Sequence, residues 1–336
     1  MRVEAGEAPA AVARLLHTEA GAYAALAASL RQQPPQAILT LARGSSDHAA
    51  HYMAYLLMAR LGRLVTSLPM SLLTLYRAPL QCRGLLALAF SQSGQSPDLV
   101  EPLRWMGNQG ARTVAFVNDA TSPLAQAAQQ TLALHAGPER SVAATKSFIC
   151  QLAAGASLAA AWQQDPAFTT ALAALPNALD EAHAQDWSAG VQALQTTERL
   201  YVIGRGAGLA VAMEAALKFK EVCGLHAEAF SGAEVQHGPM ALVEPGFPML
   251  VLAPPGPAQP GLLQLAMQLR ERGALVLLAA PPGTPGVTLP LAPCGHDDLA
   301  PITMVQSFYG MVEALAQARS LDPDKPRHLN KVTLTQ

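Results

Sequence analysis

The feature of this sequence that most constrains its fold is an internal repeat. Two segments far apart in the chain each contain a short apolar strand, a turn with Arg-Gly, and a long helix rich in alanine and methionine. The first strand is expected over 38–42, before Arg43, and the second over 200–203, before Arg205. A duplicated strand–turn–helix unit of this kind predicts two α/β domains of similar plan rather than one large core.

The repeat continues downstream of these turns. The apolar runs 86–90 and 111–117 match the runs 250–252 and 274–278 in type and order. Short apolar runs that alternate with helical patterns imply parallel strands joined by right-handed crossovers. We therefore predict an α/β fold with two tandem domains, each a parallel sheet flanked by helices in a three-layer, flavodoxin-like arrangement.

The domain boundaries follow from the same pattern. The link between the copies is expected in 165–186, where Pro166 and Pro176 interrupt a mostly helical stretch. The predicted parts are an N-terminal helical segment, a first domain, a second domain and a C-terminal tail, over 1–30, 31–175, 186–325 and 326–336.

Composition excludes several classes of protein. The 336 residues are 51% hydrophobic and 14% charged, which suits two sheets covered on both faces. The formal net charge is −2 and no run of lysine and arginine occurs, so we expect no nucleic-acid partner. No apolar stretch approaches the roughly 18 residues that a membrane span needs, and the N-terminus does not resemble a signal peptide. We expect a cytoplasmic protein without a membrane partner.

The four cysteines carry little functional signal. They are scattered without C-x-x-C spacing, so they indicate neither a zinc site nor a disulfide framework. We expect them to be small buried apolar residues: Cys82, Cys150, Cys223 and Cys294.

A hydroxyl-rich loop, 91–96, directly follows the strand expected over 86–90. Ligands of open parallel sheets bind beyond the carboxyl ends of the strands, where helix N-termini offer unpaired N–H groups. Pro97 is placed to begin the next helix and Asp98 lies in its first turn. The loop could therefore bind a phosphate dianion through its hydroxyls and amide, although an ordinary serine helix cap is the alternative. The groups concerned are Ser91, Gln92, Ser93 and Ser96.

The first strand is followed by hydroxyls as well. Ser45 and Ser46 come directly after Arg43 and Gly44, so two hydroxyl loops can converge on one ligand. The second copy has Ala-Pro-Pro-Gly-Pro over 253–257 where the first has its serine loop. One copy therefore kept polar loop chemistry and the other lost it.

The glycine-rich turn 204–208 lies between an expected strand and helix, where a dinucleotide could bind. The fingerprint for such sites is G-x-G-x-x-G/A, but Leu209 occupies its third position here. The fingerprint also needs an acidic residue after a strand about 20 residues later. We expect Glu221 in a helix and Glu228 at a helix end, so nicotinamide binding is disfavoured.

The densest group of ionisable residues lies on one predicted helix. Glu214, Lys218 and Glu221 have i, i+4, i+7 spacing, which places them on one helical face. This face could be a solvated network of salt bridges, or a buried group retained for function. The apolar neighbours favour the second reading, because buried charges are costly unless they are used.

Two histidines and a terminal lysine complete the candidate residues. His226 and His237 lack the spacing of a metal motif, so we expect no metal and no other cofactor. His237 precedes Gly-Pro in a predicted turn that would present its imidazole for proton transfer near neutral pH. Lys331 on its own would read as a solubilising tail residue.

Taken together, these motifs resemble the sugar isomerase (SIS) double-domain family. In particular, the chain resembles the isomerase half of glucosamine-6-phosphate synthase, in order and over nearly its whole length. The stretches that carry the resemblance are Arg43–Ser46, Ser91–Ser96, Ser141–Lys146, Glu214–Glu221, His226–Glu228, Glu234–Pro239 and the tail with Lys331.

The resemblance implies a role for each candidate residue. Glu221 matches the base that moves a proton between C1 and C2, and Lys218 matches its neighbour in the site. His237 matches a ring-opening histidine donated by the second subunit, which implies a homodimer, and Lys331 matches the lysine that holds the open-chain sugar. The residues that match the sugar-phosphate pocket are Ser45, Ser46, Ser91, Gln92, Ser93, Ser96 and Val142.

Two departures from the synthase shape the functional expectation. The first sugar domain begins within about 30 residues of Met1, and no glutaminase domain, which supplies ammonia in the synthase, precedes it in this sequence. We therefore expect the chain to release ammonia rather than to use it. This is the reaction of the SIS-type glucosamine-6-phosphate deaminases, whose His-Leu-Asn-Lys tail the chain resembles. The other departure is Arg43, where the synthase has a small cysteine. An arginine there could narrow the choice of substrate or add a contact to the phosphate, and it leaves the finer specificity open.

Three alternatives remain open from the sequence. Two are related phosphosugar enzymes, a fructosamine-6-phosphate deglycase and a galactosamine-6-phosphate deaminase/isomerase. The third is a non-catalytic sugar-phosphate sensor, which the joint presence of Glu221, His237 and Lys331 disfavours.

Overall fold

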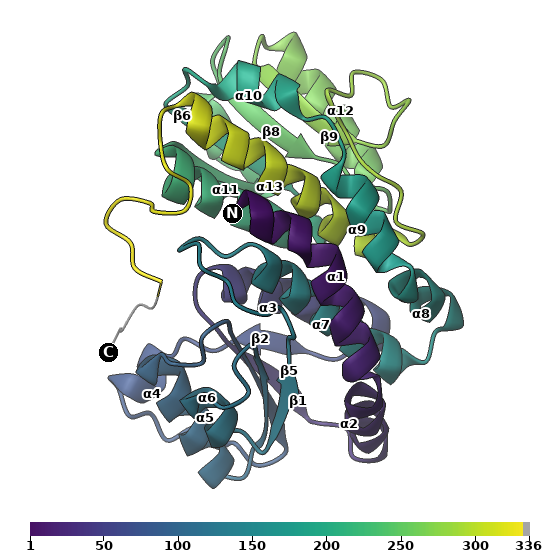
Figure 1. The fold of residues 1–336 in the computed structure, drawn as a ribbon, viewed down its shortest axis with the longest axis vertical. Coiled ribbons are helices and arrows are strands. Elements are labelled where there is room, and N and C mark those ends of the chain that lie inside the picture. The colour runs from purple at the N-terminus through teal and green to yellow at the C-terminus, as the bar shows by residue number, and fades with distance from the viewer. Residues whose placement is uncertain (332–336) are drawn as a thin grey trace. The chain divides into compact units, whose positions relative to one another are not determined.

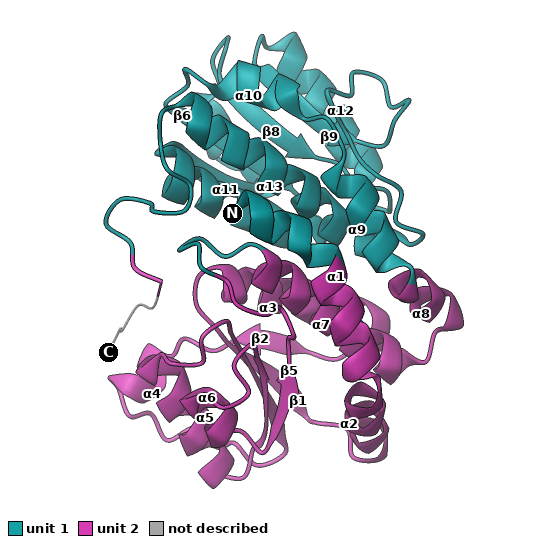
Figure 2. Ribbon diagram, viewed as in Figure 1, with its two compact units in different colours: residues 1–9, 140–145, 174–329 teal, residues 10–139, 146–173, 330–336 magenta. Residues whose placement is uncertain are grey.

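The structure, a computed structural model, describes residues 1–331 and contains two parallel sheets (Figure 1). The chain divides into two compact units (Figure 2). Unit 1 comprises 1–9, 140–145 and 174–329, and unit 2 comprises 10–139, 146–173 and the last two described residues, Asn330 and Lys331. Helix α1 (Arg2–Thr18) contributes residues to both units.

Unit 2 is built on a five-stranded sheet with the order β2-β1-β3-β4-β5, and all neighbouring strands are parallel. Its strands are β1 (Ala37–Leu41), β2 (Val65–Ser67), β3 (Leu85–Ser91), β4 (Arg112–Val117) and β5 (Gln130–Ala133). Its helices are α2 (Ala20–Gln32), α3 (Ser45–Leu61), α4 (Ser71–Thr74), α5 (Pro97–Asn108), α6 (Pro123–Ala127), α7 (Lys146–Gln163) and α8 (Pro166–Ala173).

The sheet of unit 2 is covered on both faces (Figure 1). On one face, Ala87, Ala89 and Ala115 pack against apolar residues of α4, α5 and α6. Side chains that point the other way include Phe90 and Phe116, whose rings stack with centroids 4.6 Å apart across β3 and β4. A strand buried on both faces reads as a continuous apolar run, which is why β3 was evident in the sequence.

Unit 1 repeats this plan with the order β10-β9-β8-β6-β7. Its strands are β6 (Arg199–Gly204), β7 (His226–Ser231), β8 (Pro248–Leu252), β9 (Leu275–Ala280) and β10 (Leu289–Pro290). Its helices are α9 (Leu175–His183), α10 (Ser188–Leu194), α11 (Gly208–Cys223), α12 (Gln259–Glu271) and α13 (Ala300–Ala318), with 3₁₀ turns η1 (Glu234–Gln236), η2 (Pro239–Leu242) and η3 (Asp297–Leu299).

The predicted fold class is confirmed. When strands are counted within each unit, both sheets have the order second, first, third, fourth, fifth, which is the flavodoxin-like arrangement. The turn of each copy leads from its first strand into a long helix, α3 or α11, as the sequence indicated.

One local expectation was wrong. Glu228 lies within strand β7, paired with Tyr201 of β6, and not at a helix end. Ala227 is the one fully buried residue of this edge strand, so no apolar run marks it. A dinucleotide site is still disfavoured, because Leu209 interrupts the glycine pattern and Glu228 lies in the middle of the strand.

No helix within residues 1–331 combines the length and the hydrophobicity that crossing a membrane requires.

The cysteines are buried, as the sequence predicted, and this makes a testable difference to their reactivity. Burial raises the pKa of the Cys150 and Cys223 thiols to about 12. Because the thiolate is the reactive form, neither thiol should be alkylated by iodoacetamide in the native protein at pH 8. Peptide mass spectrometry should find both labelled after unfolding in guanidinium, and rapid labelling of either in the native protein would contradict this assignment.

Candidate phosphosugar site

A polar cavity of about 330 Å³ lies in unit 2 at the carboxyl ends of β1 and β3. The chain leaves these two neighbouring strands toward opposite faces of the sheet, which is where ligands of doubly wound folds bind. The cavity is lined by Arg43, Gly44, Ser46, Phe90, Ser91, Gln92, Ser93, Ser96, Leu99 and Lys331. Six of the predicted site residues therefore come together here. Ser45, the first residue of α3, is half-buried and is not among the lining residues.

The shape of the serine loop depends on Gly94. This residue has φ +65°, and a Cβ there would overlap Ser122 and approach Val117 Cγ2 to 2.9 Å. The Gly94 N–H donates to Ser91 Oγ at 2.9 Å, and its carbonyl accepts from the Leu124 N–H at 3.1 Å. The loop is therefore folded tightly against the start of α6.

Helix α5 begins at the end of this loop, with Pro97 as its first residue. Ser96 occupies the N-cap position, but its side chain makes no capping hydrogen bond within the described helix. Ser122 does cap α6, because its hydroxyl accepts from the Ala125 N–H at 3.3 Å.

Gln151 is a site neighbour that sequence reasoning missed. This residue lies on α7, is buried, and donates through Nε2 to Ser46 Oγ at 2.9 Å. Because the hydroxyl oxygen of Ser46 accepts this bond, its own hydrogen is available to a ligand in the cavity. A buried glutamine in an apolar helix could have been noticed, but its partner lies 105 positions away in the chain.

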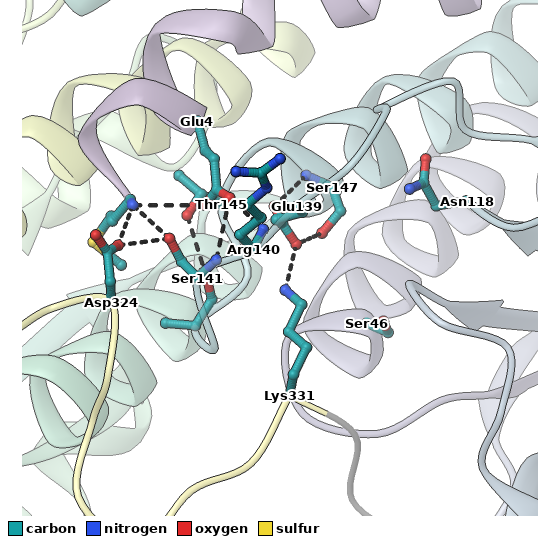
Figure 3. Close-up of polar contacts among 12 residues, drawn as sticks. Glu4, Ser46, Asn118, Glu139, Arg140, Ser141, Thr145, Ser147, Asp324 and Lys331 are labelled. Atoms are coloured by element: carbon teal, nitrogen blue, oxygen red, sulfur yellow. Dashed lines mark hydrogen bonds and ion pairs between the residues drawn. The ribbon is translucent and has the colours of Figure 1, made fainter.

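Lys331 is held at the cavity by a buried carboxylate (Figure 3). Its Nζ donates to Glu139 Oε2 at 3.1 Å, and the Glu139 side chain has no exposed area. The same carboxylate accepts from the Ser147 N–H at 3.0 Å and from the Ser147 hydroxyl at 2.7 Å. Glu139 was also missed from the sequence, because nothing local marks it as a partner of the tail.

The loop that carries Val142 is fixed within unit 1 (Figure 3). The Ser141 N–H donates to Glu4 Oε1 at 3.1 Å, and the Ser141 hydroxyl donates to Asp324 Oδ1 at 2.6 Å. Burial alone raises the pKa of Glu4, but hydrogen bonds from Ser141 and from the Arg140 backbone outweigh burial and lower that pKa. Glu4 therefore stays ionised and holds this loop.

The charged face of α11 is buried at Glu214 and Lys218, and the Glu221 side chain is 20% exposed. Glu214 and Lys218 have no exposed area, and Lys218 Nζ lies 3.5 Å from Glu214 Oε1 and in contact with Glu221 Oε2. The Tyr309 hydroxyl donates to Glu214 Oε1 at 3.2 Å. Burial lowers the pKa of Lys218, but the two carboxylates outweigh it and raise that pKa above its usual value. The two carboxylates therefore favour the protonated, cationic form of Lys218.

The two histidines occupy exposed positions in unit 1. His226 begins β7, and His237 follows η1 directly before Gly238, whose φ is +130°. The glycine permits the chain to turn there, which presents the imidazole at the surface. No group of three or more metal-ligating side chains occurs within residues 1–331.

A larger cavity, of about 450 Å³, lies between α4 and α5. It is lined mainly by apolar and charged side chains, including Leu73, Trp105, Arg77 and Glu101, and contains none of the serine-loop hydroxyls. The smaller cavity is therefore the better candidate for a sugar phosphate.

Comparison with protein families matches residues 30–161 and 193–280 to the SIS domain. The chain belongs to the SIS domain family. The two matched segments contain β1 to β5 and β6 to β9, so each copy of the repeat is one SIS domain.

Relatives of this SIS protein are enzymes of sugar phosphates. Glutamine–fructose-6-phosphate aminotransferase of Aeropyrum pernix is 39% identical over 74% of the chain and 43% of that relative. The chain thus spans about half the length of the curated relatives it matches. A candidate phosphosugar isomerase of Silicibacter pomeroyi is 45% identical with a TM-score of 0.91, covering 96% of this chain and 99% of that one. Glucosamine-6-phosphate deaminase of Thermotoga maritima shares the fold, with 22% identity, a TM-score of 0.78 and coverage of 99% and 98%.

The buried ion pairs of α11 predict a large cost for Lys218→Met. This change leaves the buried Glu214 carboxylate without its cation, which typically costs about 3–5 kcal/mol. The midpoint of urea unfolding should therefore fall well below that of the wild type. Lys220→Met is the matched control, because Lys220 lies on the same helix but is exposed, and equal midpoints for the two variants would contradict the prediction.

The serine loop predicts that Gly94→Ala weakens anion binding. The new Cβ would overlap Ser122, so the loop must move away from α6. Calorimetric titration with inorganic phosphate should show weaker binding than in the wild type. Gly62→Ala provides the control, because Gly62 has φ +62° but no atom within 4 Å of the added Cβ, and unchanged phosphate affinity in Gly94→Ala would argue against this loop as the anion site.

Proposed function

We propose that this SIS protein is a glucosamine-6-phosphate deaminase, which converts glucosamine 6-phosphate and water to fructose 6-phosphate and ammonia. The observation that carries the proposal is the hydroxyl-lined cavity of unit 2, to which the tail contributes Lys331, held by the buried Glu139. The hydroxyls can donate hydrogen bonds to phosphate oxygens. The lysine ammonium beside them can donate to the oxygens of an open-chain sugar.

The phosphate group occupies the serine loop in this proposal. Ser46, Ser91, Ser93 and Ser96 offer hydroxyls and Gln92 an amide, while the N-terminus of α5 adds a favourable dipole. The family resemblance also implies that Ser45 and Val142 bind the substrate. The Gln151 amide supports this role, because it leaves the Ser46 hydroxyl free to donate.

The reaction needs an acid for the ring oxygen and a base for carbon. His237 opens the sugar ring by proton transfer at O5, and Lys331 holds the resulting open chain. Glu221 removes the proton from C2 and returns it to C1, which converts the 2-amino aldose to a ketose imine. Water then adds to the imine carbon, and the C2–N bond breaks to release ammonia. The cationic Lys218 beside Glu221 stabilises the negative charge that develops between these steps.

The proposal includes a homodimer in the cytoplasm. His237 would be donated to the site by the second copy, which is consistent with its exposure at a glycine turn. A monomer would then lack its ring-opening acid.

The deciding experiment is an ammonia-release assay on the purified protein. We expect ammonia and fructose 6-phosphate from glucosamine 6-phosphate, and we expect Glu221→Gln to lower kcat by about 10²- to 10⁴-fold. The matched variant is Glu228→Gln, which removes an exposed carboxylate from β7 and should leave kcat unchanged.

Parallel substrates separate the alternatives. Faster release from galactosamine 6-phosphate would identify the galactosamine enzyme, and amine release from a fructosamine 6-phosphate would identify the deglycase. Phosphosugar binding without turnover of any of the three would indicate a sensor and would rule out the deaminase.

A further inference from the structure

Arg43 has the one charged or polar side chain on the cavity wall that none of the roles above uses. It follows β1 directly after Ala42, and its side chain is 55% exposed on the wall of the cavity that holds the serine loop. It is also the position at which the chain departs from the synthase pattern. A flexible, exposed arginine would ordinarily have no fixed direction, so its surroundings decide whether it can serve a ligand.

The surroundings of Arg43 give it a fixed direction. Its Nε donates to Asp98 Oδ2 at 2.9 Å, and the Asp98 side chain is only 2% exposed. Asp98 lies in the first turn of α5, where the helix dipole favours a carboxylate. Within residues 1–331, Asp98 is the one hydrogen-bonding partner of the Arg43 side chain. The Nε–H group is thus used for anchoring, and the terminal amino groups remain for a ligand.

We propose that Arg43 binds the phosphate of the substrate through these terminal amino groups, and so makes the site specific for the phosphate dianion. The polar side chains of the serine loop are neutral, and Lys331, the other cation on the cavity wall, is already paired with Glu139. A guanidinium matches two phosphate oxygens at once, which a hydroxyl cannot do. The inference rests on the proposed function for the identity of the phosphosugar.

The negative charge of Asp98 does not oppose this role. Asp98 lines the larger cavity between α4 and α5 and is not among the residues that line the serine-loop cavity. Its charge is offset by Arg43 and by the N-terminus of α5. Asp98 is therefore a positioning residue that orients the guanidinium toward the bound anion.

The second copy of the repeat provides an internal comparison. Arg205 occupies the corresponding turn after β6 and is exposed. The helix that corresponds to α5 is α12, which begins Gln259-Pro260-Gly261 and has no acidic residue in its first turn. The arginine is common to both turns, but the anchoring carboxylate and the serine loop occur only in the first copy.

The test is the affinity for inorganic phosphate, measured by calorimetry on the full chain. Arg43→Gln should weaken phosphate binding by about tenfold. This is at the lower end of the effect expected for the loss of a charged hydrogen bond, because the Arg43 side chain is half exposed. Arg43→Lys should recover part of the loss, because lysine restores the positive charge but lacks the paired N–H donors of the guanidinium. The control is Arg83→Gln, which removes an exposed arginine just before the amino-terminal end of β3, whereas the cavity lies at the carboxyl end of that strand.

The outcomes separate this inference from the deaminase proposal. Phosphate affinity of Arg43→Gln within twofold of the wild type would overturn the inference, and so would an equal loss in Arg83→Gln. Failure of the wild type to bind phosphate would overturn it too. Because phosphate binding needs no turnover, a protein that binds phosphate through Arg43 but releases no ammonia would refute the deaminase proposal alone.

Discussion

The pairing of β1 with β3 is the constraint on which the rest of unit 2 depends. These strands lie side by side in parallel, with Leu41 opposite Ala89, although β2 separates them in sequence. The chain therefore leaves their carboxyl ends in opposite directions, toward α3 on one face and α5 on the other. This divergence opens the cavity, and it brings Arg43 and Ser46 to the serine loop.

Three cationic side chains among the candidate residues and their neighbours are each paired with a buried carboxylate. Glu139 holds Lys331, Asp98 holds Arg43, and Glu214 lies beside Lys218, each with at most 2% of the carboxylate side chain exposed. A lone buried charge is costly, so each pair is stable only as long as both members are present. The cost limits how far the cations can move, and this makes them suitable for orienting a charged sugar.

The two copies of the repeat differ in where their polar and ionisable groups lie. Both sheets have the same strand order, yet the hydroxyl loop occurs in unit 2 and the buried ionisable helix in unit 1. In the second copy, proline replaces the serines after β8, and a Pro-rich loop offers few N–H donors to an anion. The duplication therefore produced two copies with the same fold and different polar side chains.

The sequence by itself determined the fold class, the strand–turn–helix repeat and the position of the serine loop, because apolar periodicity, glycine and proline act on local structure. It did not reveal edge strand β7, because that strand is weakly buried and has no apolar run. The prediction that Glu228 lies at a helix end was wrong for this reason. Only the tertiary structure decided which partners fix the candidate residues: Gln151 for Ser46, Glu139 for Lys331 and Asp98 for Arg43. Each of these pairs joins positions far apart in the chain, and such contacts are set by how the helices and strands pack, which no local pattern records.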